Sequence, residues 1–216
     1  MSQVVGLIAD THVPDTVRAI PEAALAVFRS AQVCCILHAG DIIGSQALRA
    51  LEAIAPVYAV RGNRDFLLRG LPAQRELTLG DVRIGLAHGH GPWPRYIREK
   101  LRFWLTWRAP AYRTYVQRML ALFPRADVIV FGHIHYPLVY HFGPRWVINP
   151  GSPLGKFQVP GSVGLLHLGP ARQIRPEIVL LPTAAAQARA SSVRASARAS
   201  DRARPATHPS KLEVHP

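Results

Sequence analysis

The stretch VVGLIADTH, residues 4–12, is an apolar run that ends in an aspartate and a histidine. The same pattern returns as VCCILHAGD over residues 33–41 and as VYAVRGN over residues 57–63. Between these runs, residues 21–31 and 45–53 place apolar side chains on one face at helical spacing. This alternation of strand and helix predicts a parallel sheet whose strand ends gather the functional loops.

After Leu71-Pro72 the pattern changes to strands with few helices between them. Residues 76–79 and 82–88 flank a Gly80-Asp81 turn, which predicts a β-hairpin. Five later apolar runs predict mostly antiparallel strands, at 128–131, 138–142, 146–148, 162–168 and 173–180. The expected fold class is therefore α/β, with two sheets packed face to face and helices outside them.

Polar side chains follow five successive predicted strands. A single aspartate after a strand is usually a cap or turn residue, and a single histidine is usually a core residue. Five such groups at one sheet edge are hard to produce independently, so we expect a shared site. Carboxylates mixed with imidazoles suit Mn, Fe or Zn better than Mg or Ca. The groups are Asp10 with His12, Asp41, Asn63, His88 with His90, and His133 with His135.

These pieces resemble, in type and order, the motifs of the calcineurin-like metallophosphoesterase superfamily, specifically its small bacterial and archaeal phosphodiesterase branch. Any one motif is weak, but six in this order are specific. The resemblance implies a four-layer α/β/β/α sandwich with a dinuclear metal site between the sheet ends. The matching motifs are Asp10-x-His12, Gly40-Asp41, Gly62-Asn63-x-Asp65, His88-Gly-His90, Gly132-His133-x-His135 and Asn149-Pro150-Gly151-Ser152.

The resemblance also implies a ligand set and a reaction. Two divalent cations are expected, Mn²⁺ first, with Fe, Ni and Zn as alternatives. The implied reaction is hydrolysis of a small phosphodiester by in-line attack of a hydroxide that bridges the two metals. Two alternatives with the same fold are a phosphomonoesterase and a non-catalytic scaffold similar to the retromer subunit. The implied ligands are Asp10, His12 and His135 for one metal, Asn63, His88 and His133 for the other, and Asp41 as the bridge.

Arg64 departs from the wider superfamily, where a histidine at this position helps to protonate the leaving group. A guanidinium cannot donate a proton near neutral pH, but it can bind phosphate oxygens bidentately. The small phosphodiesterase branch also commonly lacks that histidine. We therefore expect Arg64 and the amide of Asn63 to bind phosphate and His90 to face the substrate. Either His90 or water is then the acid. His38 is expected to support the adjacent turn through a hydrogen bond.

The formal charge of +13 is concentrated in two segments. Residues 92–125 hold eight basic residues and one acidic residue, and residues 183–216 hold six basic and two acidic residues. The rest of the chain is nearly neutral, with 12 basic and 10 acidic residues. The predicted chemistry therefore does not require a nucleic-acid partner. Residues 1–182 are expected to form the catalytic domain, and the Ala/Ser/Arg-rich residues 183–216 a disordered tail.

Residues 94–123 predict a helix–proline–helix insertion, because apolar residues recur at helical spacing on both sides of Pro110. The insertion region holds three of the four tryptophans, at positions 93, 104 and 107. The first expectation is that its apolar stripe packs on the core while its arginines face water. The alternatives are a lid or a contact between copies in a homo-oligomer, and a weak contact with an anionic membrane or polyanion.

Three further features of the sequence favour a cytoplasmic location. The chain start carries no cationic segment or small-residue cleavage site. No apolar run approaches the ~18–20 residues needed to span a bilayer. The two cysteines, Cys34 and Cys35, are adjacent in an apolar run, which predicts two buried thiols on opposite faces of a strand.

Overall fold

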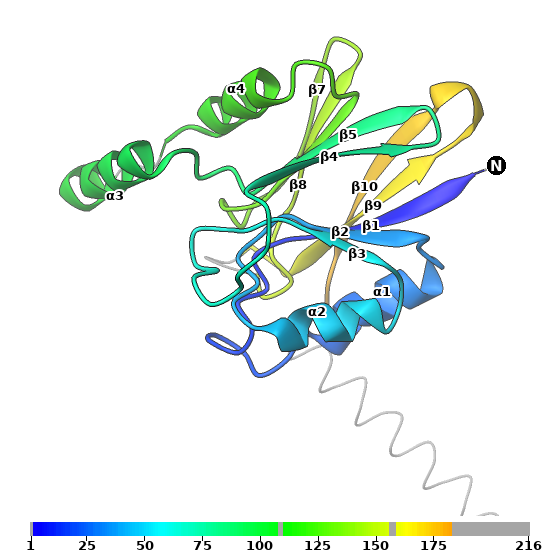
Figure 1. Ribbon diagram of the computed structural model, residues 1–216, viewed down its shortest axis with the longest axis horizontal. Helices are drawn as coiled ribbons and strands as arrows, with labels where there is room; N and C mark the ends of the chain where they lie inside the picture. The colour runs from blue at the N-terminus through cyan, green and yellow to red at the C-terminus, as the bar shows by residue number, and fades with distance from the viewer. Residues whose placement is uncertain (1, 108–109, 156–158, 183–216) are drawn as a thin grey trace, which may run out of the picture. The chain divides into compact units, whose positions relative to one another are not determined.

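The computed structural model describes residues 2–107, 110–155 and 159–182. Within these ranges the chain forms two five-stranded sheets that face each other, with helices outside them (Figure 1). The disorder predicted for residues 183–216 falls outside the described residues.

The first sheet contains the strand–helix alternation predicted at the start of the chain. Its strand order is β10-β9-β1-β2-β3. β1 is parallel to β2 and β2 is parallel to β3, whereas β9 is antiparallel to both β1 and β10. Helices α1 and α2 connect the parallel strands and bury Phe28 and Leu51 against the outer face. The elements are β1 (Gln3–Ile8), α1 (Glu22–Ser30), β2 (Cys35–His38), α2 (Ser45–Glu52), β3 (Val57–Ala59), β9 (Ser162–Leu168) and β10 (Ile174–Leu180), with a 3-10 turn at Pro170–Arg172 before β10.

The second sheet has the order β4-β5-β6-β8-β7. Its outer pairs, β4 with β5 and β7 with β8, are antiparallel, which confirms the hairpin predicted at Gly80-Asp81 and the antiparallel pairing expected for the later strands. The expectation of mostly antiparallel pairing is wrong for β6, which is parallel to both of its neighbours. This parallel centre places the carboxyl ends of β5 and β6 at the same sheet edge. The elements are β4 (Gln74–Leu79), β5 (Val82–Ala87), β6 (Val128–Phe131), β7 (Pro137–Phe142) and β8 (Arg145–Pro150).

The main core lies between the two sheets. Leu7 and Leu37 of the first sheet are fully buried in one cluster with Leu86, Val130 and Ile148 of the second. Because side chains alternate along a strand, the opposite faces of the same strands are free to pack on helices. The layers run from α1 and α2 through the two sheets to α4 (Tyr112–Leu122), which confirms the expected α/β/β/α sandwich.

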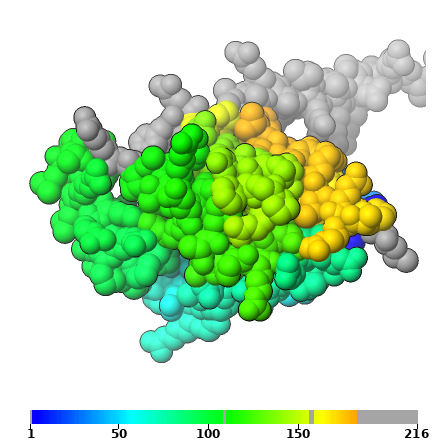
Figure 2. All heavy atoms as spheres, turned by 90° about the horizontal axis from the view of Figure 1, so that it is seen from above, coloured from blue at the N-terminus to red at the C-terminus, as the bar shows by residue number. Residues whose placement is uncertain are grey.

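The two helices of the insertion differ in how they pack. α4 buries Tyr115, Val116 and Met119 against the outer face of the second sheet, as expected. α3 (Trp93–Thr106) buries no residue, so the expected packing of its apolar stripe on the core is wrong. In Figure 1, α3 extends beyond the sheets, and Figure 2 shows the green atoms of both helices on one side of the molecule. The physical reason is that α4 already covers the sheet face that α3 would need.

The cysteines are buried only in part. Cys35 lies in the core and burial raises the pKa of its thiol to about 12, but Cys34 is exposed. Cys34 precedes β2 instead of lying in it, so the prediction of two buried thiols on one strand is wrong for Cys34. Among the described residues, no helix has the length and apolar character needed to cross a bilayer.

Candidate metal centre

The carboxyl ends of five strands bring the predicted ligands to one place. Backbone hydrogen bonds tie the loops together: Asp10 N donates to Gly40 O at 3.0 Å, and His12 N donates to Asp41 O at 3.1 Å. In the second sheet, Gly132 N donates to His88 O at 3.1 Å. All seven predicted ligands lie in or beside these loops, namely Asp10, His12, Asp41, Asn63, His88, His133 and His135.

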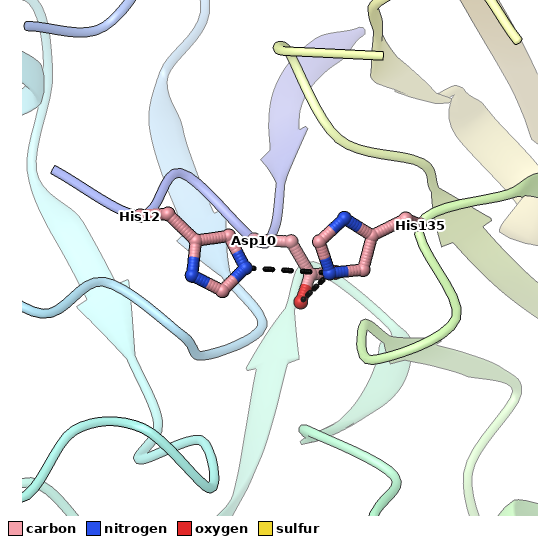
Figure 3. A group of neighbouring side chains, drawn as sticks. All are labelled: Asp10, His12 and His135. Carbon is pink, nitrogen blue, oxygen red and sulfur yellow. Dashed lines mark hydrogen bonds and ion pairs between the residues drawn. The ribbon is translucent and has the colours of Figure 1, made fainter. Parts of the chain in front are cut away.

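The first donor group joins the loop after β1 to the loop after β6. The Nε2 atoms of His12 and His135 lie 3.3 Å apart, and His135 Nε2 lies 3.4 Å from Asp10 Oδ1 (Figure 3). The two imidazole rings stack with their centroids 5.0 Å apart. Ligand atoms of all three residues lie within 4.8 Å of one another, so one divalent cation can be held here.

The second donor group is centred on Asn63. Asn63 Oδ1 lies 3.0 Å from both His88 Nε2 and His133 Nδ1. The amide orientation is set from the other side, because Asn63 Nδ2 donates to the Tyr96 hydroxyl at 3.2 Å. One amide oxygen and two imidazole nitrogens therefore converge on a single point.

The hydrogen bonds of His88 show that the second donor group needs a positive charge among its members. His88 Nδ1 donates to the carbonyl of Ala39 at 2.8 Å, which leaves the lone pair of the neutral ring on Nε2. That atom faces Asn63 Oδ1 at 3.0 Å and Asp41 Oδ1 at 3.4 Å, both of which are also electron donors. A proton or a metal cation must lie between them, and hydrogen bonding of Nδ1 to a carbonyl is the usual arrangement of a metal-binding histidine.

Asp41 lies between the two donor groups. Its Oδ1 faces His88 Nε2, and its Oδ2 lies 3.8 Å from His12 Nε2. Burial opposes the charge on Asp41, yet His88 holds the pKa of this carboxyl well below its usual range. Burial likewise opposes protonation of His88, but Asp41 raises the pKa of His88 to about 9. A carboxylate with one oxygen toward each group is suited to bridge two cations.

Five of the seven predicted ligands have left-handed backbone conformations, with φ between 47° and 75°. Non-glycine residues rarely adopt this region, and strained residues of this kind cluster at functional sites. The conformation turns each side chain back toward the site directly after its strand. The five are Asp10, His12, Asp41, His133 and His135.

Asp65 supports the site without being one of the predicted ligands. Its buried carboxylate accepts four backbone hydrogen bonds. Oδ2 accepts from the N–H groups of Asp41 at 2.9 Å and Gly62 at 2.7 Å. Oδ1 accepts from Ile42 and Ile43, each at 2.7 Å. Asp65 therefore joins the loop of Asp41 to the loop of Asn63. Its place in the Gly62-Asn63-x-Asp65 motif was the only feature of the sequence that indicated a role at the site.

The Asn149-Pro-Gly-Ser motif anchors two other loops. Asn149 Nδ2 donates to Gly132 O at 2.7 Å, just before His133. The Ser152 hydroxyl donates to Asp10 O at 2.8 Å. These buried bonds hold the backbone on both sides of the first donor group.

The supporting role predicted for His38 is confirmed. His38 Nδ1 accepts a hydrogen bond from Gly40 N at 3.2 Å, and its Nε2 lies 3.1 Å from the Thr11 hydroxyl. Complete burial lowers the pKa of His38 to about 3, so the ring is neutral and can accept this bond.

A pocket of about 360 Å³ opens over the donor groups, and Arg64 lies on its wall. The Arg64 side chain forms an ion pair with Asp15, and its backbone N donates to Asp41 Oδ1 at 2.9 Å. The side chain of Arg64 is about half-exposed.

His90 lies beside the ligands but lines a different cavity. Its ring centroid is 5.4 Å from that of His88 and 6.3 Å from that of His133. It contributes to the wall of an adjoining cavity of about 730 Å³ and not to the pocket over the donor groups. Burial, followed by the nearby His88, lowers the pKa of His90 to about 4. Its predicted role toward substrate stays a prediction.

Three residues of α3 line the pocket over the donor groups, and no motif in the sequence predicted a site role for them. They are Trp93, Tyr96 and Lys100. Lys100 Nζ lies 5.6 Å from the centroid of the Tyr96 ring, and Tyr96 contacts the amide of Asn63. Their spacing of three and four residues puts them on one side of the helix, which is the available sequence signal.

Comparison with known proteins agrees with this geometry. Residues 4–170 match the family described as the calcineurin-like phosphoesterase superfamily domain. A "Probable metallophosphoesterase" of Methanothermobacter thermautotrophicus is 36% identical over 151 residues, 69% of this chain and 76% of the relative.

Solved structures share the fold. An archaeal phosphodiesterase has a TM-score of 0.58 at 19% identity, covering 82% of this chain and all of that one. Wild-type Vps29 of Entamoeba histolytica, solved with Zn²⁺, has a TM-score of 0.58 at 26% identity, covering 82% of this chain and 99% of that one. Because residues 4–170 match this family and the archaeal relative is 36% identical, the chain belongs to the calcineurin-like phosphoesterase superfamily.

Proposed function

We propose that this protein is a phosphodiesterase that uses two divalent cations, with Mn²⁺ as the first candidate. The observation that carries the proposal is the second donor group, where His88 Nε2 and His133 Nδ1 both face Asn63 Oδ1 at 3.0 Å. Electron donors held this close favour a cation among them. The first donor group, with Asp41 between the two, supports a second cation. The cytoplasmic location stays a proposal from the sequence.

Bound to these ligands, the cations would acidify water and stabilise negative charge on the phosphate oxygens. The protein supplies the remaining binding groups. Arg64 and Lys100 line the pocket and can pair with phosphate oxygens that point away from the donor groups. Asn63 lines the same pocket, and its Nδ2 donates one hydrogen to the Tyr96 hydroxyl, which leaves the second N–H for a phosphate oxygen.

Hydrolysis of a diester forms one P–O bond to the oxygen of water and breaks the P–O bond to one ester group. That group leaves as an alcohol after it takes up a proton. Arg64 cannot supply this proton, because a guanidinium stays charged at neutral pH. The pKa of His90 is lowered to about 4, which leaves its ring neutral near pH 7, so water is the proposed source of this proton.

Two alternatives have the same fold. The likeness to Vps29 structures keeps a non-catalytic scaffold in view. In this chain, however, every predicted ligand position holds a side chain that can coordinate metal, and these side chains converge, which favours an enzyme. A phosphomonoesterase would use the same ligands, so only substrate comparison separates it from a diesterase.

The deciding experiment measures hydrolysis of bis(p-nitrophenyl) phosphate and p-nitrophenyl phosphate with added Mn²⁺. We expect the diester to be the better substrate, and Asp41→Asn and His133→Ala to lose at least about 100-fold in kcat/KM. The first removes the negative charge and one oxygen of the bridging carboxylate, and the second removes a ligand. His141→Ala, an exposed histidine on β7, is the matched control. Equal activity of the wild type and both ligand variants would refute the assignment. Preference for the monoester would refute the diesterase function.

A further inference from the structure

Helix α3 places a tyrosine hydroxyl next to the second donor group. The Tyr96 hydroxyl accepts a hydrogen bond from Asn63 Nδ2 at 3.2 Å, and Tyr96 lines the pocket over the donor groups. The other end of the same amide, Asn63 Oδ1, faces His88 Nε2 and His133 Nδ1. The hydroxyl therefore lies one amide group away from the point where a cation would be held.

The hydrogen of this hydroxyl is free to bind a ligand. Because the Tyr96 oxygen accepts from Asn63, its own hydrogen must point away from that amide. Among the described residues, the hydroxyl makes no second hydrogen bond. A phenol with an ordinary pKa of about 10 keeps its proton at neutral pH. Tyr96 therefore offers one O–H donor to whatever occupies the pocket.

Neighbouring rings hold Tyr96 in this position. The centroid of its ring lies 5.5 Å from that of Trp93, 6.0 Å from that of His90 and 5.8 Å from that of His133. Tyr96 is half-buried by these contacts, although most of α3 is exposed. A donor that is already in place needs no reorganisation when charge develops on a bound ligand.

An ion pair anchors the helix that carries Tyr96. Glu99, one turn further along α3, pairs with Arg118 of α4 at 2.5 Å, and both side chains are largely buried. Arg118 also donates to Gly89 O at 2.7 Å, next to the predicted ligand His88. The helix is thus tied to α4 and to a loop of the metal centre, which keeps Tyr96 over the donor groups.

The pocket around the hydroxyl suits an anion. Lys100 and Arg64 line it, and Lys100 Nζ lies 5.6 Å from the centroid of the Tyr96 ring. The one acidic residue among those that line it is Asp41, which lies between the two donor groups. Oxygens of an ionised phosphate only accept hydrogen bonds, so they match an O–H donor in a pocket with two cationic side chains.

From these observations we propose that Tyr96 is a catalytic residue, whose O–H donates a hydrogen bond to an oxygen of the bound phosphate. The hydrogen stays on Tyr96, so water still supplies the proton for the leaving alcohol. One P–O bond forms to water and one breaks to the ester group, as in the proposed hydrolysis. A fixed donor to an oxygen that gains negative charge stabilises the transition state. This role rests on the proposed phosphodiesterase function.

The test measures binding of inorganic phosphate to the full chain saturated with Mn²⁺, by isothermal titration calorimetry. Tyr96→Phe removes the hydroxyl and keeps the ring, so the ring contacts that hold residue 96 are retained. A hydrogen bond to a charged group contributes about 1.5–3 kcal/mol, which corresponds to roughly 10- to 150-fold in affinity. We therefore expect Tyr96→Phe to bind phosphate at least about 10-fold more weakly and to lose at least as much in kcat/KM for bis(p-nitrophenyl) phosphate. Tyr112→Phe, at an exposed tyrosine of α4, is the matched control and should change neither.

Saturation with Mn²⁺ separates direct contact from an effect through Asn63. A bound cation holds Asn63 Oδ1 by itself, so a tyrosine that only orients this amide would leave phosphate affinity at the wild-type value. Equal phosphate affinity of the wild type and Tyr96→Phe would therefore overturn the proposal, and so would a wild type that binds no phosphate.

The two activities can also fail separately. Phosphate binding that depends on Tyr96, without hydrolysis of bis(p-nitrophenyl) phosphate, would refute the enzymatic function and leave the hydroxyl contact standing. Hydrolysis at equal rates by the wild type and Tyr96→Phe would do the reverse.

Discussion

Asp65→Asn replaces one carboxylate oxygen by an NH₂ group and is expected to loosen two loops of the metal centre together. Each oxygen of Asp65 accepts two backbone N–H groups, at 2.7–2.9 Å. In either orientation of the asparagine, two of these four donors would face another donor. Hydrogen bonds to a charged group contribute about 1.5–3 kcal/mol each, so the loss of two predicts a decrease of about 3–6 kcal/mol in the free energy of unfolding.

The assay is urea denaturation of the wild type and the variant in EDTA, so that metal binding does not contribute. Asp81→Asn, at an exposed position in the β4–β5 turn, is the matched control and should change stability by less than about 0.5 kcal/mol. Because Asp65 holds the backbone of Asp41, Mn²⁺ affinity should also fall by about 10–100-fold. If Asp65→Asn unfolds within about 1 kcal/mol of the wild type, the four hydrogen bonds do not organise the site as argued.

Two further predictions concern other parts of the molecule. Burial lowers the pKa of His38 to about 3, from an ordinary value of 6.5. Between these pH values the unfolded chain binds a proton at His38 that the folded chain does not, so the free energy of unfolding falls as the pH drops through this range. When the pH falls from 7 to 5, the free energy of unfolding of the metal-free wild type should decrease by about 2 kcal/mol more than that of His38→Gln. An equal decrease in both proteins would contradict a buried, neutral His38. On α3, the side chains of Trp104 and Leu105 are 69% and 84% exposed beside a basic helix face, which suits contact with an anionic membrane. The double variant Trp104→Ser/Leu105→Ser should therefore bind phosphatidylglycerol vesicles less than the wild type does. Leu180→Ser, at another exposed leucine, is the control and should bind like the wild type. Equal sedimentation of the wild type with anionic and neutral vesicles would rule this contact out.

The sequence predicts the site best where a local pattern of residues carries the chemistry. An apolar strand followed by Asp10, Asp41 or Asn63 can be recognised residue by residue, and parallel pairing then requires these strand ends to meet. The parallel pairing of β6 was missed, because a short apolar strand looks the same in either direction. The left-handed conformations of ligands such as His133 were also hidden, since residue type alone does not disclose a strained backbone.

The sequence by itself determined the order of the elements, the residues at the strand ends and the amphipathic character of both insertion helices. Only the tertiary structure decided which of those helices is buried. α4 packs on the second sheet, whereas α3 buries no residue and instead carries Tyr96 and Lys100 to the metal pocket. Of the basic residues in 92–125 that the structure describes, Lys100 lines the metal pocket and Arg118 the adjoining cavity. The physical reason is competition for one sheet face, which depends on distant strands and is not encoded in either helix alone.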